Sequence, residues 1–327
     1  MTRALGLLIV GIMLLSCSRG GSSGPEVVLY SSVDDHLLRE VVAAFEKDSG
    51  VRVRLVGDTE ATKTTGLVER LLAERERPRA DVWWSSEPFG SVRLAAEGVL
   101  ERSSAAGREP AAFHSFAARA RVIAYNPRRV PEPPRSLAEL TDPGWRGRIG
   151  MARPQFGTTR GHMGLLLLDC GAERYRAWAG SMKNAGVRVY DGNASVVRGI
   201  AQGEIDVGLT DTDDVWSAQR NGWPVELAYA GSACPVEGDG PLLIPNTVGL
   251  VRGRPNPQSA QRLLDYLLSA QVERMMAQSD SRNIPLTTDL SGEFRHLMPQ
   301  GARRPDYTAV AEQIPRALEI WDEVMGR

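Results

Sequence analysis

The chain has 327 residues, which is long enough for two lobes that each bury a core of their own. Its 39 basic and 40 acidic residues give a formal net charge of −1, so the charge balance drives the chain neither toward nucleic acid nor toward a bilayer surface. None of its three cysteines lies in a Cys-x-x-Cys or Cys/His spacing, so the sequence does not indicate a zinc site.

The chain begins with a segment typical of export. Residues 4–15 are an unbroken apolar run that is too short to span a membrane as a mature helix. The following Leu-Leu-Ser-Cys sequence ends at Cys17 and resembles the bacterial lipobox, whose cysteine is lipid-modified after cleavage. We therefore predict a lipoprotein signal peptide over 1–17, a flexible linker over 18–25, and an exported chain anchored to the cell membrane on its periplasmic or extracellular side. The alternative is an ordinary secretory peptide that is cut elsewhere.

Two blocks of the chain alternate short β-rich runs with helical patterns, as parallel α/β structure requires. The first block predicts three strands and two helices, in the order 27–30, 37–47, 51–56, 65–74 and 81–84. The second block predicts the same series at 149–152, 161–168, 187–190, 194–201 and 205–209.

Two further strands are expected to connect these blocks. The first, 121–127, ends at a proline, and the second, 246–251, returns the chain and is followed by a helix over 257–276. We therefore predict an α/β fold of two lobes with parallel-rich sheets, two crossover strands and an interlobe cleft. The first lobe is expected over 26–121 plus 246–327, and the second over 122–245.

A cluster of acids follows the last strand of the second block. Asp211, Asp213 and Asp214 come directly after 205–209, and no Lys or Arg lies between positions 199 and 219. Their counter-charge must therefore come from elsewhere in the fold or from a ligand, which makes the cluster a candidate site for a positive group. The alternative is a helix start, because Asp and Thr are favoured N-caps and acids suit the positive end of a helix dipole.

Polar side chains also follow other predicted strands, at the sheet edge where ligands of α/β folds bind. Ser32 and Asp34 follow the first strand and Glu87 follows the third. Ser32 together with Asp35 equally fits a capping box.

The second lobe offers a possible anion site. Thr158, Thr159 and Arg160 follow a glycine at an expected helix start, and Asn193 follows the next strand. A Gly-Thr-Thr turn at a helix N-terminus presents backbone N–H groups to an anion. The two threonines equally fit a simple helix cap.

Cys170 and Cys234 remain once Cys17 is used for lipidation, and an exported compartment allows them to pair. We predict a disulfide between them, and two separate buried thiols are the alternative.

No catalytic constellation emerges from the sequence. The four histidines show no His-Glu-x-x-His spacing, and neither a Gly-x-Ser-x-Gly elbow nor a P-loop is present. The acids alone could serve general acid/base chemistry, but no nucleophile or positioned histidine accompanies them. An enzyme is therefore disfavoured.

From position 26 to about 327 the chain resembles the solute-binding proteins of bacterial ABC importers, in particular their ferric-iron-binding branch. The segments that carry this resemblance are 28–32, 45–51, 80–84, 120–127, 145–150 and 193–198. The resemblance implies a monomeric two-lobe protein of the type II periplasmic-binding fold that closes around a small ligand. It also implies delivery of that ligand to a membrane permease driven by a cytoplasmic ATPase, and no role with nucleic acid.

The chain departs from the ferric-binding pattern where the metal ligands lie. Those proteins carry a Tyr-Tyr pair at the positions of Asp213 and Asp214, and a frequent His at the position of Asp34. The resemblance then implies iron(III) held by Asp213 and Asp214, with Asp211 beside them and Asp34 or Glu87 completing the shell. A synergistic anion would lie on Thr158, Thr159 and Asn193.

Two alternatives stay open. A carboxylate set suits hard cations in general, including calcium, magnesium and manganese. The same acids also suit an ammonium group, with Thr158, Thr159, Arg160 and Asn193 holding an anionic group opposite. The ligand would then be a small organic solute such as an aminophosphonate, an organophosphate or another zwitterion.

Overall fold

The computed structural model describes residues 24–326 apart from 59–63, 106, 235–239, 288–289 and 291. The expected signal peptide, Cys17 and most of the expected linker lie outside the described residues. Within the described part of the chain, no helix has both the length and the apolar character needed to cross a membrane.

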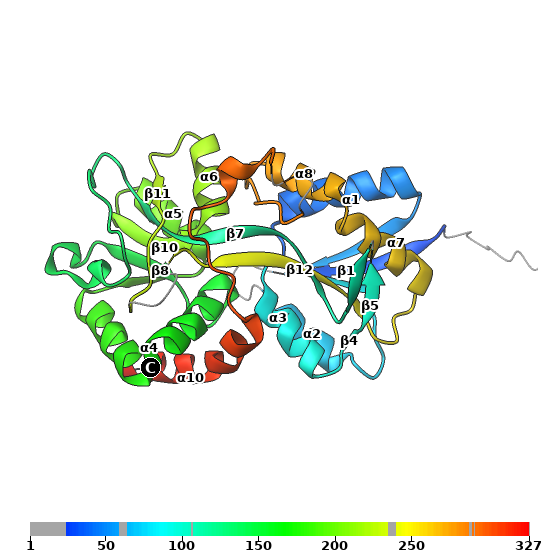
Figure 1. Cartoon of the computed structure of the whole chain (residues 1–327), viewed down its shortest axis with the longest axis horizontal. Helices are drawn as coiled ribbons and strands as arrows, with labels where there is room; N and C mark the ends of the chain where they lie inside the picture. Colours follow the sequence, from blue (N-terminus) through cyan, green and yellow to red (C-terminus); the bar gives the residue numbers. More distant parts are fainter. Residues whose placement is uncertain are drawn as a thin grey trace, which may run out of the picture.

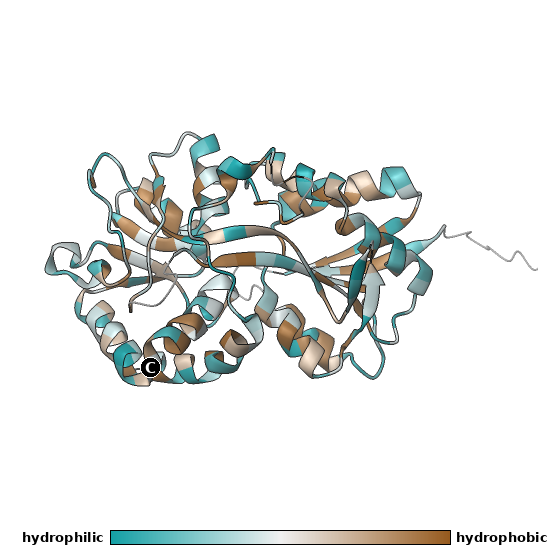
Figure 2. Ribbon diagram, viewed as in Figure 1, coloured by the Kyte–Doolittle hydropathy of each residue, from teal (hydrophilic) through white to brown (hydrophobic). Residues whose placement is uncertain are grey.

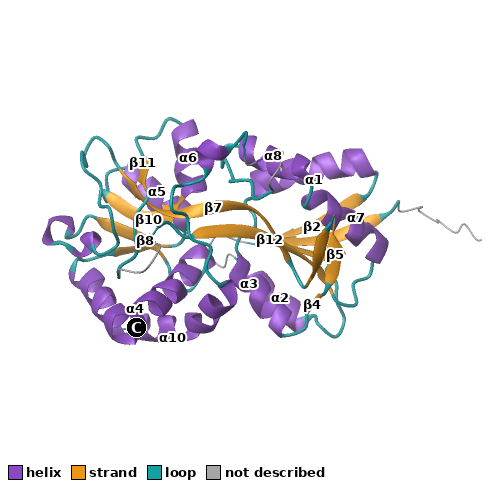
Figure 3. Cartoon of the chain, viewed as in Figure 1, coloured by secondary structure: helices purple, strands orange, loops and turns teal. Residues whose placement is uncertain are grey.

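Two α/β lobes share one ten-stranded sheet, and two long strands run from one lobe into the other (Figure 1; Figure 3). The strand order is β2-β1-β3-β12-β7-β10-β8-β9, with β4 paired to β12 and β11 paired to β7. The crossover strands β7 and β12 pair antiparallel with each other, whereas β1 with β2 and β3, and β8 with β9 and β10, pair parallel. The predicted two-lobe α/β fold is confirmed. The strands are β1 (Glu26–Ser31), β2 (Arg52–Gly57), β3 (Val82–Ser85), β4 (Leu100–Glu101), β7 (His114–Tyr125), β8 (Ile149–Ala152), β9 (Arg188–Tyr190), β10 (Val207–Asp211), β11 (Glu226–Ala228) and β12 (Leu243–Val251), with a separate hairpin of β5 (Ser103–Ala105) and β6 (Arg108–Ala111).

Helices cover both faces of the sheet and turn their apolar sides toward it (Figure 2). In α1, apolar residues that recur every three or four positions, such as Leu38, Val41 and Phe45, are buried in the core of the first lobe. The helix ends where Gly50 adopts a left-handed conformation with φ of 68°. The helices are α1 (Asp35–Ser49), α2 (Thr65–Ala73), α3 (Pro88–Ala96), α4 (Gly157–Asn184), α5 (Asn193–Ala201), α6 (Thr212–Arg220), α7 (Pro257–Leu267), α8 (Ala270–Gln278) and α10 (Tyr307–Met325), with short 3₁₀ turns at Glu139–Thr141, Pro143–Trp145 and Arg295–Leu297.

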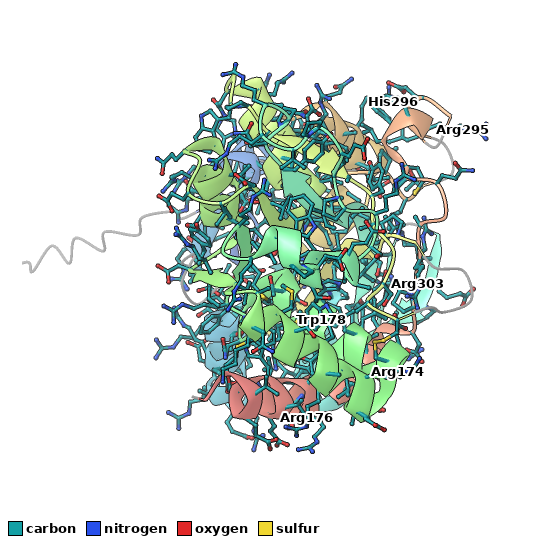
Figure 4. The ribbon with its side chains drawn as sticks, turned by 90° about the vertical axis from the view of Figure 1, so that its left-hand side faces the viewer. Arg174, Arg176, Trp178, Arg295, His296 and Arg303 are labelled. Atoms are coloured by element: carbon teal, nitrogen blue, oxygen red, sulfur yellow. A yellow bond between two sulfur atoms is a disulfide. The ribbon has the colours of Figure 1, made fainter. Side chains whose placement is uncertain are left out.

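The last helix packs with the second lobe, although the sequence analysis predicted that it belongs to the first. Figure 1 shows α10 beside α4, and Ile320 and Trp321 of α10 are buried in the same core as Trp178 of α4. The Tyr175 hydroxyl of α4 donates to the Ala317 carbonyl at 3.1 Å. Figure 4 shows this end of the molecule. The C-terminal part of α10 therefore packs in the core of the second lobe.

The predicted disulfide joins α4 to the segment before β12. Cys170 and Cys234 are bonded, with their Cα atoms 5.5 Å apart. The bond lies next to a break in α4, where Gly171 has φ of 72°. Beside it, Arg303 forms two hydrogen bonds of 2.7 and 2.9 Å with Asp169. The alternative of two separate thiols is wrong.

Both crossover strands are irregular at the same level between the lobes. Ala117 in β7 has φ of 33°, and the β12–β7 register shifts between Pro245 and Asn246. The Ala117 N–H donates to the carboxylate of the fully buried Glu273 at 2.7 Å, and the Asn246 amide donates to the Ala117 carbonyl at 2.8 Å. The side chains of Glu273 and Asn246 therefore provide hydrogen-bond partners for the N–H and the carbonyl of Ala117 at this bulge.

Candidate ligand-binding site

The carboxyl ends of the strands of both lobes open into one cleft, as the sequence predicted. Asp34 and Ser86 reach it from the first lobe, where they follow β1 and β3. The rest of the wall comes from Arg119 of the crossover strand β7 and from residues at or just after the carboxyl ends of β8, β9 and β10 in the second lobe. The residues of the cleft are Asp34, Ser86, Arg119, Ala152, Arg153, Phe156, Gly157, Thr158, Thr159, Asp191, Gly192, Asn193, Asp211, Asp213 and Asp214.

Three helices begin at this cleft. The first turns of α4 and α5 bring Gly157, Thr158, Thr159 and Asn193 to the wall, and α6 begins directly after Asp211. The first turn of an α-helix has N–H groups without partners inside the helix and carries a partial positive charge. The second-lobe wall therefore has the character of an anion site.

Asp211 is the most densely bonded carboxylate of the cleft, and it is only 1% exposed. Its Oδ1 accepts a hydrogen bond from Arg121 Nη1 at 3.0 Å. Its Oδ2 accepts from the Thr158 hydroxyl at 2.6 Å and from the Asn193 amide at 2.9 Å. Because both oxygens are bonded to protein donors, Asp211 organises the wall and is poorly placed to ligate an ion.

The same network positions the polar groups expected to hold an anion. Arg121 Nη2 donates to the Thr159 hydroxyl at 3.1 Å, and the Asn193 amide donates to the Thr158 hydroxyl at 3.1 Å. The structure thus brings Thr158, Thr159 and Asn193 together, as the sequence predicted.

The three acids after β10 lie close together. Oxygen atoms from Asp211, Asp213 and Asp214 all lie within 4.8 Å of one another. Asp214 accepts hydrogen bonds from the Thr210 hydroxyl at 2.9 Å and from the Asp211 N–H at 3.4 Å, which fits the alternative role of a helix cap. The helix-start interpretation is confirmed, with Asp211 as the N-cap of α6 and Asp214 in its capping box, while a ligand site at the cluster stays a prediction.

Their counter-charge comes from the crossover strand β7. Arg119 Nη1 donates to Asp213 Oδ2 at 3.1 Å, and Arg119 Nη2 donates to the Ser86 carbonyl of the first lobe. Burial alone would lower the pKa of Arg119, but the carboxylates of Asp213, Asp211, Asp34 and Asp214 outweigh it and raise that pKa above its usual value. Arg119 therefore stays charged and touches both lobes.

Arg119 and Arg121 were missed by the sequence analysis. Because side chains alternate across a strand, the two arginines lie on the same face of β7 with Ala120 between them. Two arginines two positions apart within an otherwise apolar strand were the sequence signal from which they could have been identified. Arg153 was also missed, and it lines the cleft beside Asp191, with which it forms an ion pair of 3.0 Å.

Three predicted site residues, Glu87, Arg160 and Ser32, are not among the residues that line the cleft. Glu87 caps α3, where its carboxylate accepts from the N–H groups of Phe89 at 2.6 Å and Gly90 at 3.0 Å, and burial raises its pKa. Arg160 of α4 lies near enough to Glu87 for the two charges to interact, and burial lowers the pKa of Arg160. Neither side chain is among the cleft residues, because helix geometry presents Thr158 and Thr159 there instead.

Ser32 is buried and bonds to Ser86, which lines the cleft. Its hydroxyl accepts a hydrogen bond from the Ser86 N–H at 3.1 Å, so it joins the ends of β1 and β3. The capping box with Asp35 is not formed, because α1 begins at Asp35 with Asp34 as its N-cap. Asp35 instead pairs with Arg39 one turn later.

The family of the chain follows from comparison with known proteins. A model described as "Bacterial extracellular solute-binding protein" matches residues 27–279. The chain belongs to this family. Iron uptake protein A1 of Synechocystis sp. is 27% identical over 320 residues, which cover 88% of each chain. A putative 2-aminoethylphosphonate-binding periplasmic protein of Salmonella paratyphi A is 25% identical over 309 residues, which cover 86% of this chain and 85% of the relative.

The solved structures agree with the fold of the ferric-binding branch. The apo ferric ion-binding protein A of Pasteurella haemolytica superposes with a TM-score of 0.79 at 18% identity, covering 92% of this chain and 98% of that one. The predicted resemblance is confirmed, and this solute-binding protein is not an enzyme.

Proposed function

We propose that this protein is the solute-binding component of an ABC importer and that it binds a small organic zwitterion in the interlobe cleft. The observation that carries the proposal is the distribution of charge in one cleft. The N-termini of α4 and α5, with Thr158, Thr159 and Asn193, form a wall suited to a phosphonate, phosphate or carboxylate group. Asp213 and Asp34 line the same cleft with carboxylates suited to an ammonium group.

The bonding of the acids favours an organic cation over a metal ion. Asp211 is bonded through both oxygens to protein donors, and Arg119 already pairs with Asp213. The phenolates of the ferric-binding branch are replaced by Asp213 and Asp214, which are weaker and less selective ligands for iron(III). The relatives named as putative 2-aminoethylphosphonate-binding proteins match the chain at an identity similar to that of the iron uptake proteins.

Calorimetric titration tests the proposal with a matched pair of solutes. 2-Aminoethylphosphonate carries both charged groups, whereas ethylphosphonate lacks the amine. We expect the zwitterion to bind at least about 100-fold more tightly, a difference of about 2.7 kcal/mol, and EDTA to leave its binding unchanged. Equal affinity for the two solutes, or failure of phosphoethanolamine and related zwitterions to bind at all, would count against the proposal.

Iron(III) with a companion anion is the second candidate. It is favoured by the acid cluster, whose oxygens lie within 4.8 Å of one another, and by the iron uptake relatives. Iron would then be the cargo of Asp213, Asp214 and Asp34, with the anion on the wall of α4 and α5. Elemental analysis of protein purified without chelator, beside an Asp213→Ala/Asp214→Ala variant, distinguishes this candidate from the first.

Export and anchoring complete the proposal. A lipid on Cys17 would hold the protein at the cell membrane, beside the permease and the ATPase subunit that receive the solute from the monomeric binding protein. Metabolic labelling with palmitate tests this part, because a Cys17→Ser variant should lose the label while an ordinary secretory peptide would give none in either form.

A further inference from the structure

One guanidinium lies beside the carboxylates that the sequence analysis predicted as metal ligands. Arg119 Nη1 bonds to Asp213 at 3.1 Å, and Arg119 Nε lies 3.5 Å from Asp211 Oδ2. Asp34 and Asp214 lie near enough for their charges to act on the same group. Arg119 therefore supplies part of the positive charge that these acids require, from within the chain.

Arg119 is held in this position from both lobes. It is only 7% exposed, and its Nη2 donates to the Ser86 carbonyl while Nη1 bonds to Asp213 across the cleft. A guanidinium does not lose its proton in proteins, so its charge is permanent. A multivalent ion among the same oxygens would lie within a few ångströms of this charge, where like charges repel strongly because little water screens them.

We propose that Arg119 is the specificity-determining residue of the cleft, because its guanidinium takes the place of a metal ion and so excludes multivalent cations from the carboxylates. The inference rests on the proposed function and adds to it the residue that separates organic solutes from metals. It predicts that the carboxylates of the cleft can bind a metal ion once Arg119 is replaced by an uncharged residue.

The experiment measures Tb³⁺ uptake by equilibrium dialysis and elemental analysis. Arg119→Met removes the charge and keeps an unbranched side chain, whereas Arg119→Lys keeps the charge. Arg153→Met is the matched control, because Arg153 lines the same cleft and pairs with Asp191 instead of the cluster. We expect Arg119→Met to bind Tb³⁺ stoichiometrically and at least about 100-fold more tightly than the wild type, Arg119→Lys and Arg153→Met.

The outcomes separate this inference from the proposed function. Stoichiometric Tb³⁺ uptake by the wild type overturns the inference without any variant, and so does a folded Arg119→Met that takes up no more than the wild type. If Arg119→Met unfolds without metal, refolding on addition of Tb³⁺ supports the inference and failure to refold overturns it. A gain of Tb³⁺ binding in Arg119→Met, while no zwitterion binds the wild type, would leave the inference standing and overturn the proposed function alone.

Discussion

Replacing Asp211 by asparagine removes one negative charge from the most densely bonded carboxylate of the cleft. The change keeps the shape of the side chain but leaves Arg121, 4% exposed, and Arg119, 7% exposed, with less counter-charge. Breaking a buried ion pair by neutralising one partner costs about 3–5 kcal/mol, because the remaining charge stays buried. We therefore expect the free energy of unfolding to fall by that amount.

Asp214→Asn is the matched control in the same cluster. Asp214 is half-buried, so water can replace part of what its charge contributes, and its neutralisation should cost about 1 kcal/mol or less. Urea unfolding followed by far-UV circular dichroism compares the two. With a slope of about 3 kcal/mol per molar urea, the midpoint of Asp211→Asn should lie about 1 M below that of the wild type. Equal midpoints for Asp211→Asn and Asp214→Asn would refute the account of Asp211 as the organiser of the wall.

Three further predictions concern the disulfide, a buried histidine and the anion wall. Cys170 and Cys234 are 64 residues apart, so the Cys170→Ala/Cys234→Ala variant should lose about 4 kcal/mol by the chain-entropy model, and an unchanged urea midpoint would contradict this. Burial, followed by the charge of Arg121, holds the pKa of His162 well below 6.5 in the fold, so the unfolded state takes up the proton first. The free energy of unfolding should therefore fall as pH drops below 6.5, by up to about 1.4 kcal/mol per pH unit. Urea unfolding at several pH values measures this loss, and the His162→Gln variant should lack the part that His162 contributes. Thr159→Val should weaken zwitterion binding by about tenfold in calorimetry, because it removes a hydroxyl from the anion wall, and an unchanged Kd would show that the anion binds elsewhere.

The short parallel strands of both lobes could be predicted from the sequence because their apolar runs are local signals. The predicted strands 27–30 and 187–190 differ by a residue or so from Glu26–Ser31 and Arg188–Tyr190. The strand ends then placed Asp34, Thr158, Asn193 and Asp213 around one cleft, since the carboxyl ends of parallel strands share a sheet edge.

The pairing of the acids with Arg119 and Arg121 could not be predicted because the partners are far apart in the chain. The crossover strand was expected at 121–127, whereas β7 runs from His114 to Tyr125, since Arg119 and Arg121 interrupt the apolar run at its centre. Their partners lie about 90 residues farther along the chain, in Asp211 and Asp213. No local pattern shows that two buried arginines will neutralise these acids.

The last helix was misplaced for a related reason. Its amphipathic pattern shows that Ile320 and Trp321 need a core, but the cores of both lobes lie within reach of the end of the chain. Contact with Tyr175 and Trp178 of α4 decides between them, and that contact is set by tertiary packing.

The central claim is that the cleft takes an organic zwitterion and excludes metal. Native mass spectrometry with elemental analysis, on protein purified from its exported compartment without chelator, tests it most directly. The account predicts a bound organic mass that contains an anionic group and an amine, with less than stoichiometric iron or any other multivalent metal. Stoichiometric iron in the wild type that disappears in the Asp213→Ala/Asp214→Ala variant would contradict the account and establish a carboxylate form of the ferric site.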